Sequence, residues 1–203
     1  MREAAPTVKR IEPKRGELLP AMVFAAAGAR VALHYAHSDA GANSAVEEIA
    51  GGGGQAAAFQ GDLNDTDAIT QLAADAGDWL GGFDVLVNNA GITMNKPFLE
   101  VTPEQFDTVY NVNIRAMYFL TQAVVPAMIE QSKGAVINLT SVHAYAGMTE
   151  HTVYAGTKAA IVAFTRVLSL ELAQKGVRVN AIAPGWILVE NHLQVLGDFD
   201  QQE

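Results

Sequence analysis

Residues 134–158 read GAVINLTSVHAYAGMTEHTVYAGTK, and this stretch decides the fold class of the chain. It opens with an apolar run over 134–141 that has the length and composition of a buried strand. An Ala-rich segment over 152–175 has the spacing of a long helix and ends at Gly176. The helix carries Tyr154 and Lys158 four residues apart, so we expect both side chains on one face.

The same alternation of strand and helix extends in both directions from this unit. We expect strands over 31–35, 55–59, 83–88, 134–141 and 177–182, and helices over 43–50, 67–80, 102–131 and 152–175. Apolar strands that alternate with helices are typical of a parallel sheet covered by helices on both faces. The predicted fold class is therefore α/β, with a doubly wound parallel sheet in a single domain.

Polar residues gather where these strands end. Asn88-Asn89-Ala90-Gly91 closes one strand, Ser141 closes another, and Pro184-Gly185 follows a third. Sheets of this class bind ligands at the carboxyl ends of their strands. Asn113 lies in the middle of a predicted helix, where an amide side chain is mildly unfavourable, so its presence there suggests a functional task.

The pair of Tyr154 and Lys158 has the chemistry of a general acid–base. An ammonium beside a phenol favours the phenolate and lowers the pKa of the phenol from about 10 toward neutrality. A group that exchanges its proton near neutral pH needs such a shift. Because Tyr and Lys also recur at this spacing by chance on solvated helices, the prediction depends on the other motifs at the same sheet edge.

With these motifs in place, the chain resembles the short-chain dehydrogenase/reductase family of NAD(P)-dependent oxidoreductases, which have a Rossmann-type sheet. The resemblance covers residues 21–189, and it is carried by the motifs Asp62-Leu63, Asn88-Asn89-Ala90-Gly91, Asn113, Ser141, Tyr154-x-x-x-Lys158 and Pro184-Gly185. The chain is most similar to the branch of 3-oxoacyl-acyl-carrier-protein reductases and sugar or alcohol dehydrogenases. This resemblance implies hydride transfer between NADP(H) or NAD(H) and a small carbonyl or alcohol substrate.

The resemblance also implies catalytic roles. Tyr154 would exchange the proton of the substrate oxygen, and Ser141 would hold that oxygen. Lys158 would bind the nicotinamide ribose hydroxyls and lower the pKa of Tyr154. Asn113 would hold a water molecule that links Lys158 to solvent as a proton relay.

Further positions would contact the cofactor. Asp62 and Leu63 would contact the adenine, Asn88 and Ala90 the adenosine side, and the main chain near Ile187 the carboxamide. The stretch 34–38 at the end of the strand over 31–35 reads HYAHS and has no acid to hold a ribose 2′-hydroxyl. This favours NADP over NAD, although the stretch also has no Arg to hold a 2′-phosphate.

The two ends of the chain depart from the family pattern. Counting back from Gly28, the three glycines of the pyrophosphate loop should fall where this chain has Ile11, Arg15 and Glu17. We therefore interpret residues 1–20 as an atypical segment from a shifted reading frame, and 21–203 as the family domain, incomplete at its C-terminus. Val189 replaces a Thr that is usual in the family. The alternative function is a truncated, non-catalytic remnant that acts only as a binding or partner subunit.

Composition excludes several other classes. The net charge of −9 argues against a nucleic-acid surface, and the absence of Cys excludes disulfides and thiolate metal sites. No run of about eighteen apolar residues is present and the first twenty residues have no apolar core of a signal peptide, so we expect no membrane contact and a cytoplasmic location. His34 and His37 lack a nearby carboxylate at ligand spacing, so no metal site is expected.

Two further expectations concern surfaces. His143 and His151 lie between Ser141 and Tyr154, where they either touch the substrate or serve as ordinary loop or core histidines, and we favour the second. The helices 102–131 and 152–175 have more apolar surface than one sheet needs. In the family these helices pair between subunits, so we expect a homodimer or homotetramer.

Overall fold

The computed structural model describes residues 19–37, 39–185 and 187, and the chain divides into two compact units. One unit comprises residues 1–58 and 186–203, and the other comprises 59–185. The predicted N-terminal positions Ile11, Arg15 and Glu17 lie outside the described residues, and so does Val189. The second unit contains every predicted site residue except Ile187.

In the described part of the chain up to residue 60, two helices and two strands alternate: α1 Leu19–Ala26, β1 Arg30–Tyr35, α2 Asp39–Gly51 and β2 Gln55–Gln60. β1 and β2 are hydrogen-bonded neighbours, and the boundary between the units runs through β2. Pro20 lies in the first turn of α1, where the missing N–H of proline has no helical partner to lose. The proline is therefore compatible with the helix that it opens.

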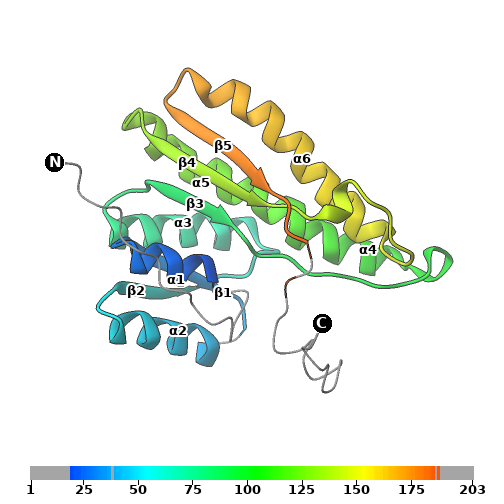
Figure 1. Ribbon diagram of the computed structural model, residues 1–203, viewed down its shortest axis with the longest axis horizontal. Coiled ribbons are helices and arrows are strands. Elements are labelled where there is room, and N and C mark those ends of the chain that lie inside the picture. Colours follow the sequence, from blue (N-terminus) through cyan, green and yellow to red (C-terminus); the bar gives the residue numbers. More distant parts are fainter. Residues whose placement is uncertain (1–18, 38, 186, 188–203) are drawn as a thin grey trace, which may run out of the picture. The chain divides into compact units, whose positions relative to one another are not determined.

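The second unit is a three-stranded parallel sheet with helices packed on it. Its strands are β3 Val85–Asn88, β4 Gly134–Leu139 and β5 Val177–Ile182. They lie side by side in the order β3-β4-β5 (Figure 1). The helices are α3 Thr66–Leu80, α4 Pro103–Tyr110, α5 Ala116–Glu130 and α6 Thr152–Ala173, with short 3₁₀ turns at Phe98–Glu100 and Val142–Ala144. In the register, Asn88 is opposite Asn138, and Leu139 is opposite Ile182. The parallel strands place the carboxyl ends of β3, β4 and β5 at one edge.

Local signals in the sequence explain where several helices begin and end. The side chain of Asp65 accepts a hydrogen bond from the N–H of Asp67 at the start of α3, and Gly81 ends that helix in the left-handed conformation. Thr102 and Gln105 form a reciprocal capping box at the start of α4, with Pro103 in its first turn. The predicted helix start at 102–104 is thereby confirmed.

The predicted single helix over 102–131 has an interruption. A π-helical turn over Asn111–Arg115 separates α4 from α5, with a hydrogen bond from the N–H of Ala116 to the carbonyl oxygen of Asn111. Such a turn holds one residue more than an α-helical turn, and such turns occur often at functional sites. Asn113 lies at its centre and is 1% exposed, so the polar residue that stood out in the sequence marks this irregularity.

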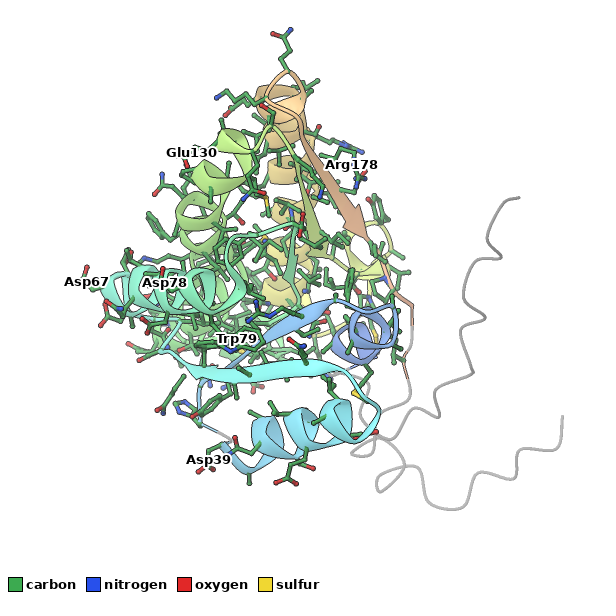
Figure 2. All side chains as sticks on the ribbon, turned by 90° about the vertical axis from the view of Figure 1, so that its left-hand side faces the viewer. Asp39, Asp67, Asp78, Trp79, Glu130 and Arg178 are labelled. Atoms are coloured by element: carbon green, nitrogen blue, oxygen red, sulfur yellow. The ribbon has the colours of Figure 1, made fainter. Side chains whose placement is uncertain are left out.

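The main core lies between the sheet and one layer of helices. It joins α3, α5 and α6 to the strands through buried apolar side chains, namely Ala73, Val124, Val125, Met128, Val136, Leu172, Val177 and Val179. Charged groups stay outside this core, and Figure 2 shows Asp67 and Asp78 on the surface of α3, and Glu130 at the end of α5. Trp79, the neighbour of Asp78, instead makes an edge-on contact with Phe59 in the same unit.

The strands form two sheets instead of the predicted single one. Within the described residues, the β1–β2 pair and the β3–β4–β5 sheet share no strand. The parallel order and the alternation with helices agree with the predicted class.

Two helical stretches, which correspond to the predicted helices 102–131 and 152–175, are long and apolar. Pro103–Glu130 and Thr152–Ala173 each have a window of eighteen residues with a mean hydropathy of 1.2, which is sufficient in length and composition to cross a membrane. Each stretch packs against the sheet through one side and buries polar residues there, Asn113 and Thr121 in the first and Lys158 in the second. A core helix with an additional apolar outer face has the same composition, so the expectation of no membrane contact stays a prediction.

Gly176, the residue before β5, offers a direct test of how closely the backbone packs against Ser132. Its φ is +77°, and a Cβ at this position would collide with the backbone carbonyl of Ser132. We therefore expect Gly176→Ala to lower the free energy of unfolding by about 2 kcal/mol or more in denaturant titrations. Gly147→Ala is the control, because a Cβ there meets nothing within 4 Å, and it should change stability by less than about 0.5 kcal/mol. Equal effects of the two substitutions would contradict the structure.

Candidate active site

The segment that follows β4 is tied to α6 on one side and to the end of β5 on the other. Thr140 donates its hydroxyl proton to the carbonyl oxygen of Lys158 over 2.7 Å, and its N–H donates to the carbonyl oxygen of Ile182 over 2.9 Å. The N–H of Val142 donates to the carbonyl oxygen of Pro184 over 3.1 Å. These bonds hold Ser141, which lies between Thr140 and Val142, at the carboxyl edge of the sheet.

Lys158 is buried at this edge and is 5% exposed. Its Nζ donates to the carbonyl oxygen of Leu139, the last residue of β4, over 2.9 Å. Burial penalises the charged form and lowers the pKa of Lys158 to about 8. Burial of the ammonium therefore lowers the free energy of unfolding.

Tyr154 lies on the same face of α6, as the spacing of four residues predicts. Lys158 Nζ is 5.5 Å from the centre of the Tyr154 ring, within the range of a cation–π contact. The phenol is half-buried, whereas the hydroxyl of Thr157 is turned inward and donates to the carbonyl oxygen of Tyr154 over 2.7 Å. The predicted juxtaposition of phenol and ammonium is confirmed.

Asn113 connects three segments of the site. Its Oδ1 accepts from the N–H of Ile92 over 2.8 Å, and its Nδ2 donates to the carbonyl oxygen of Ile92 over 2.9 Å. The same Nδ2 donates to the hydroxyl of Thr157 over 3.1 Å. The side chain therefore joins the π-helical turn to the loop after β3 and to α6, next to Tyr154 and Lys158.

A second set of buried amides and hydroxyls forms hydrogen bonds between the strands and helices near this edge. Asn88 donates through Nδ2 to Thr121 over 2.9 Å and to Asn138 over 2.8 Å, and Asn138 donates to Thr165 over 2.9 Å. These bonds connect β3 and β4 to α5 and α6. The sequence analysis missed Asn138 as a functional position, although a polar residue inside an apolar strand was a usable signal.

Ser141 is 7% exposed, and its Oγ accepts a hydrogen bond from the N–H of His143 over 3.2 Å. This bond occupies a lone pair and leaves the hydroxyl proton available for a different acceptor. The 3₁₀ turn over Val142–Ala144 begins directly after Ser141 and orients the hydroxyl through this contact.

The predicted adenine contacts lie in the loop after β2. Asp62 is exposed, and its Oδ1 accepts from the N–H and the side-chain amide of Asn64 over 2.9 and 3.0 Å. Leu63 is 8% exposed and packs with Ile69, Leu72 and Ala116, so its side chain belongs to the core.

The other predicted cofactor positions have different surroundings. Ala90 is exposed after β3, while Asn88 is buried and both protons of its amide are engaged. Ile187 is 46% exposed and belongs to the other compact unit. The structure thus brings Asn113, Tyr154 and Lys158 together with the segment of Ser141, and leaves the cofactor roles of the remaining positions as predictions.

Comparison with known proteins identifies the family. The profile of the family described as short chain dehydrogenase matches residues 19–196. The chain belongs to the short chain dehydrogenase family. Its members are NAD(P)-dependent oxidoreductases.

One curated relative and two solved structures illustrate the similarity. The chain is 38% identical over 170 residues to a 3-oxoacyl-[acyl-carrier-protein] reductase of Synechocystis sp., covering 84% of this chain and 69% of the relative. A 7α-hydroxysteroid dehydrogenase solved with NADH and 7-oxo glycochenodeoxycholic acid has a TM-score of 0.82 and 37% identity, covering 90% of this chain and 70% of that one. A metagenomic short-chain oxidoreductase solved with NADP has a TM-score of 0.79 and 31% identity, covering 86% and 80%.

The described residues of this short chain dehydrogenase fit the nicotinamide ribose of a dinucleotide. An ammonium has three N–H donors, and the bond to Leu139 uses one of them, which leaves donors for ribose hydroxyls. Glycine at position 91 lets the backbone lie close to the side chains of Asn113 and Lys158. A Cβ at this position would be only 3.3 Å from Asn113 Oδ1 and 3.4 Å from Lys158 Nζ.

The burial of Lys158 predicts a particular dependence of stability on pH. The lowered pKa means that between pH 8 and 10.5 the unfolded chain retains a proton on Lys158 that the folded chain has lost. The unfolded state then binds more protons, so this group makes the folded state more stable as pH rises through that window. Relative to Lys158→Met, the unfolding free energy of the unmodified chain should rise by about 3 kcal/mol between these pH values.

Denaturant unfolding at a series of pH values measures this difference, and titration of other groups cancels between the two chains. Lys175→Met is the control, because Lys175 is exposed and its removal should leave the pH dependence unchanged. A difference between the unmodified chain and Lys158→Met that stays flat from pH 8 to 10.5 would contradict the burial of the charge.

Proposed function

We propose that this chain transfers hydride between NADP(H) or NAD(H) and a carbonyl or alcohol substrate, with Tyr154 as the acid–base group. The observation that carries the proposal is the position of Lys158 Nζ, 5.5 Å from the centre of the Tyr154 ring, on a buried side chain at the carboxyl end of β4. Sheets of this class bind their ligands at that edge.

Tyr154 exchanges the proton in this mechanism. When bound, the reduced nicotinamide supplies a hydride to the carbonyl carbon, and the oxidised form accepts it in the reverse direction. As the carbonyl oxygen becomes negative, Tyr154 donates its phenolic proton to it. The ammonium of Lys158 stabilises the negative charge that is left on the phenol oxygen, and burial strengthens this attraction.

Ser141 holds the substrate oxygen. Its lone pair already accepts from the N–H of His143, so the hydroxyl proton is directed to another acceptor, and the substrate oxygen is that acceptor in the proposed mechanism. A donor that is fixed before the reaction stabilises charge as it develops on the oxygen, because no reorientation is needed.

We assign Asn113 a positioning role, which its hydrogen bonds support, and a role in a proton relay. The bonds of its amide to Ile92 and Thr157 fix the loop after β3 against α6, and so fix the surroundings of Lys158. In the relay, the proton that Tyr154 gives up is replaced through Lys158 and a water molecule held by Asn113.

The cofactor assignment follows the same edge of the sheet. We assign the nicotinamide ribose to Tyr154 and Lys158, and the adenosine half to Asp62, the backbone of Leu63, Asn88 and Ala90. The main chain near Ile187 takes the carboxamide. The solved complexes of similar proteins with NADP and with NADH support either dinucleotide, and the absence of an acid at the end of β1 favours NADP. We place the enzyme in the cytoplasm.

Two exposed helix surfaces support a homo-oligomer. Tyr118 of α5 and Phe164 of α6 are in contact, with ring centres 5.5 Å apart, so the two helices share one outer surface. Along α6, Val167 is 57% and Leu170 is 80% exposed. Exposed apolar side chains of this kind are typical of protein interfaces, and we assign them to a homodimer or homotetramer.

Replacement of the phenol tests the proposed acid–base group. We expect Tyr154→Phe to lower the rate of NADPH oxidation by a carbonyl substrate at least about 100-fold, because no other group supplies the proton. Protection by NADPH against thermal unfolding should remain, since the substitution removes only the hydroxyl. Tyr145→Phe removes an exposed hydroxyl from the same segment and should leave the rate unchanged. Full activity of Tyr154→Phe would overturn the assignment, and no thermal shift with millimolar NADPH or NADH would favour the non-catalytic remnant.

Light scattering after size-exclusion chromatography tests the interface. We expect a mass of two or four chains for the unmodified protein, and a mass of one chain for the double variant Val167→Glu/Leu170→Glu, because two charges cannot be buried without partners. Leu99→Glu places the same charge on another exposed leucine, which is 92% exposed, and should leave the mass unchanged. A single-chain mass for the unmodified protein would contradict the assembly.

A further inference from the structure

The connection between Ser141 and Tyr154 brings two histidines together beside the phenol. The rings of His143 and His151 stack with centres 5.1 Å apart and an angle of 30° between their planes. Both rings also stand edge-on to Tyr154, with centres 6.1 and 6.3 Å away and angles of 70° and 76°. Two imidazoles therefore lie within the length of a small substrate from the phenol.

The state of His151 follows from its surroundings. The ring is 8% exposed, and its Nδ1 lies 2.7 Å from the carbonyl oxygen of Thr149. Because a carbonyl oxygen only accepts hydrogen bonds, Nδ1 must be the nitrogen that carries the proton. Nε2 is thus the nitrogen that remains for a ligand, and it becomes a donor when the ring is protonated.

His143 has a different signature. Within the described residues, its Nδ1 is shielded from solvent and has no hydrogen-bond partner. A buried polar atom without a partner is unfavourable, and in a native protein it calls for a ligand, an ion or a water molecule. A half turn about the Cβ–Cγ bond exchanges Nδ1 with Cδ2, so the ring can present this nitrogen on either edge.

Two lysines come from segments near the two histidines. The ammonium of Lys158 lies 5.5 Å from the centre of the Tyr154 ring, which both imidazoles also contact. Lys96 is tied to the segment before α6, since its N–H donates to the carbonyl oxygen of Glu150 over 2.8 Å, and its Nζ donates to Gln105 over 3.1 Å. Glu150 is the acidic residue of that segment, and it is exposed.

We infer that His143 and His151 bind a carboxylate of the substrate, so that the natural substrate is a short oxo acid or the corresponding hydroxy acid. The two oxygens of a carboxylate can accept one bond from each ring. This inference rests on the proposed function, because it places the carboxylate relative to a carbonyl beside Tyr154.

A substrate without a free carboxylate beside its carbonyl, such as the 3-oxoacyl group in the name of the Synechocystis relative, would not need two imidazoles at this point. The distinction can be measured with a matched pair of ligands that differ only in the charge of one group. 3-Hydroxybutanoate and its methyl ester have the same alcohol and nearly the same shape.

The experiment is a calorimetric titration of the full chain with each ligand at pH 7 in the presence of NADPH, in which neither alcohol can react. We expect the acid to bind at least tenfold more tightly than the ester. His143→Phe and His151→Phe, which retain an aromatic ring for stacking, should each weaken acid binding at least tenfold and change ester binding less than threefold. Tyr145→Phe, in the same segment, should change neither.

Equal affinity for acid and ester, or equal losses for both ligands in the histidine variants, would overturn the inference. Titrations with NADPH alone and with NADH alone separate this outcome from a failure of the proposed function. If neither dinucleotide binds, the proposed function fails, and the same acid–ester comparison on the cofactor-free chain still decides the role of the histidines.

Discussion

The buried ammonium of Lys158 is the constraint on which the site depends. A charge that is 5% exposed needs polar partners, and the carbonyl oxygen of Leu139 and the ring face of Tyr154 supply them. The first partner attaches α6 to the end of β4, and the second places the phenol beside the charge. The same burial that makes the group costly to fold also makes its attraction for a phenolate strong, because the surrounding dielectric is low. Burial of Lys158 therefore lowers the stability of the fold and, at the same time, strengthens the interaction that the proposed chemistry needs.

Hydrogen bonds from other segments keep this arrangement in place. Thr140 ties the end of β4 to the backbone of Lys158, while Asn113 ties the loop after β3 to Thr157. In addition, Asn88 and Asn138 connect β3 and β4 to α5 and α6. Each buried amide in this set finds partners on different elements, so strand ends and helices must be assembled together. Polar networks that are fully satisfied in this way specify one arrangement of the parts.

Much of this edge could be predicted from the sequence, because the deciding features are local. A spacing of four residues on a helix puts Tyr154 and Lys158 on one face whatever the tertiary structure. The π-helical turn at Asn113 could not be predicted in the same way, since it depends on bonds to Ile92, twenty-one residues away. The partner of Asn138 depends on the register of two parallel strands, which periodicity does not reveal. The stacking of His143 on His151 likewise results from the path of the connecting segment. The sequence does not reveal that path, and it therefore favoured the interpretation as ordinary loop or core histidines.

The central claim is that Lys158 makes Tyr154 an acid–base group for hydride transfer. A single-turnover experiment with a carbonyl substrate and NADPH that carries deuterium at the transferred position of C4 tests it directly, with the alcohol product analysed by mass spectrometry. The account predicts that the unmodified chain delivers deuterium to the former carbonyl carbon, and that Lys158→Met, saturated with the same cofactor, delivers it at least about 100-fold more slowly. Deuterium transfer by Lys158→Met at the rate of the unmodified chain would contradict the account.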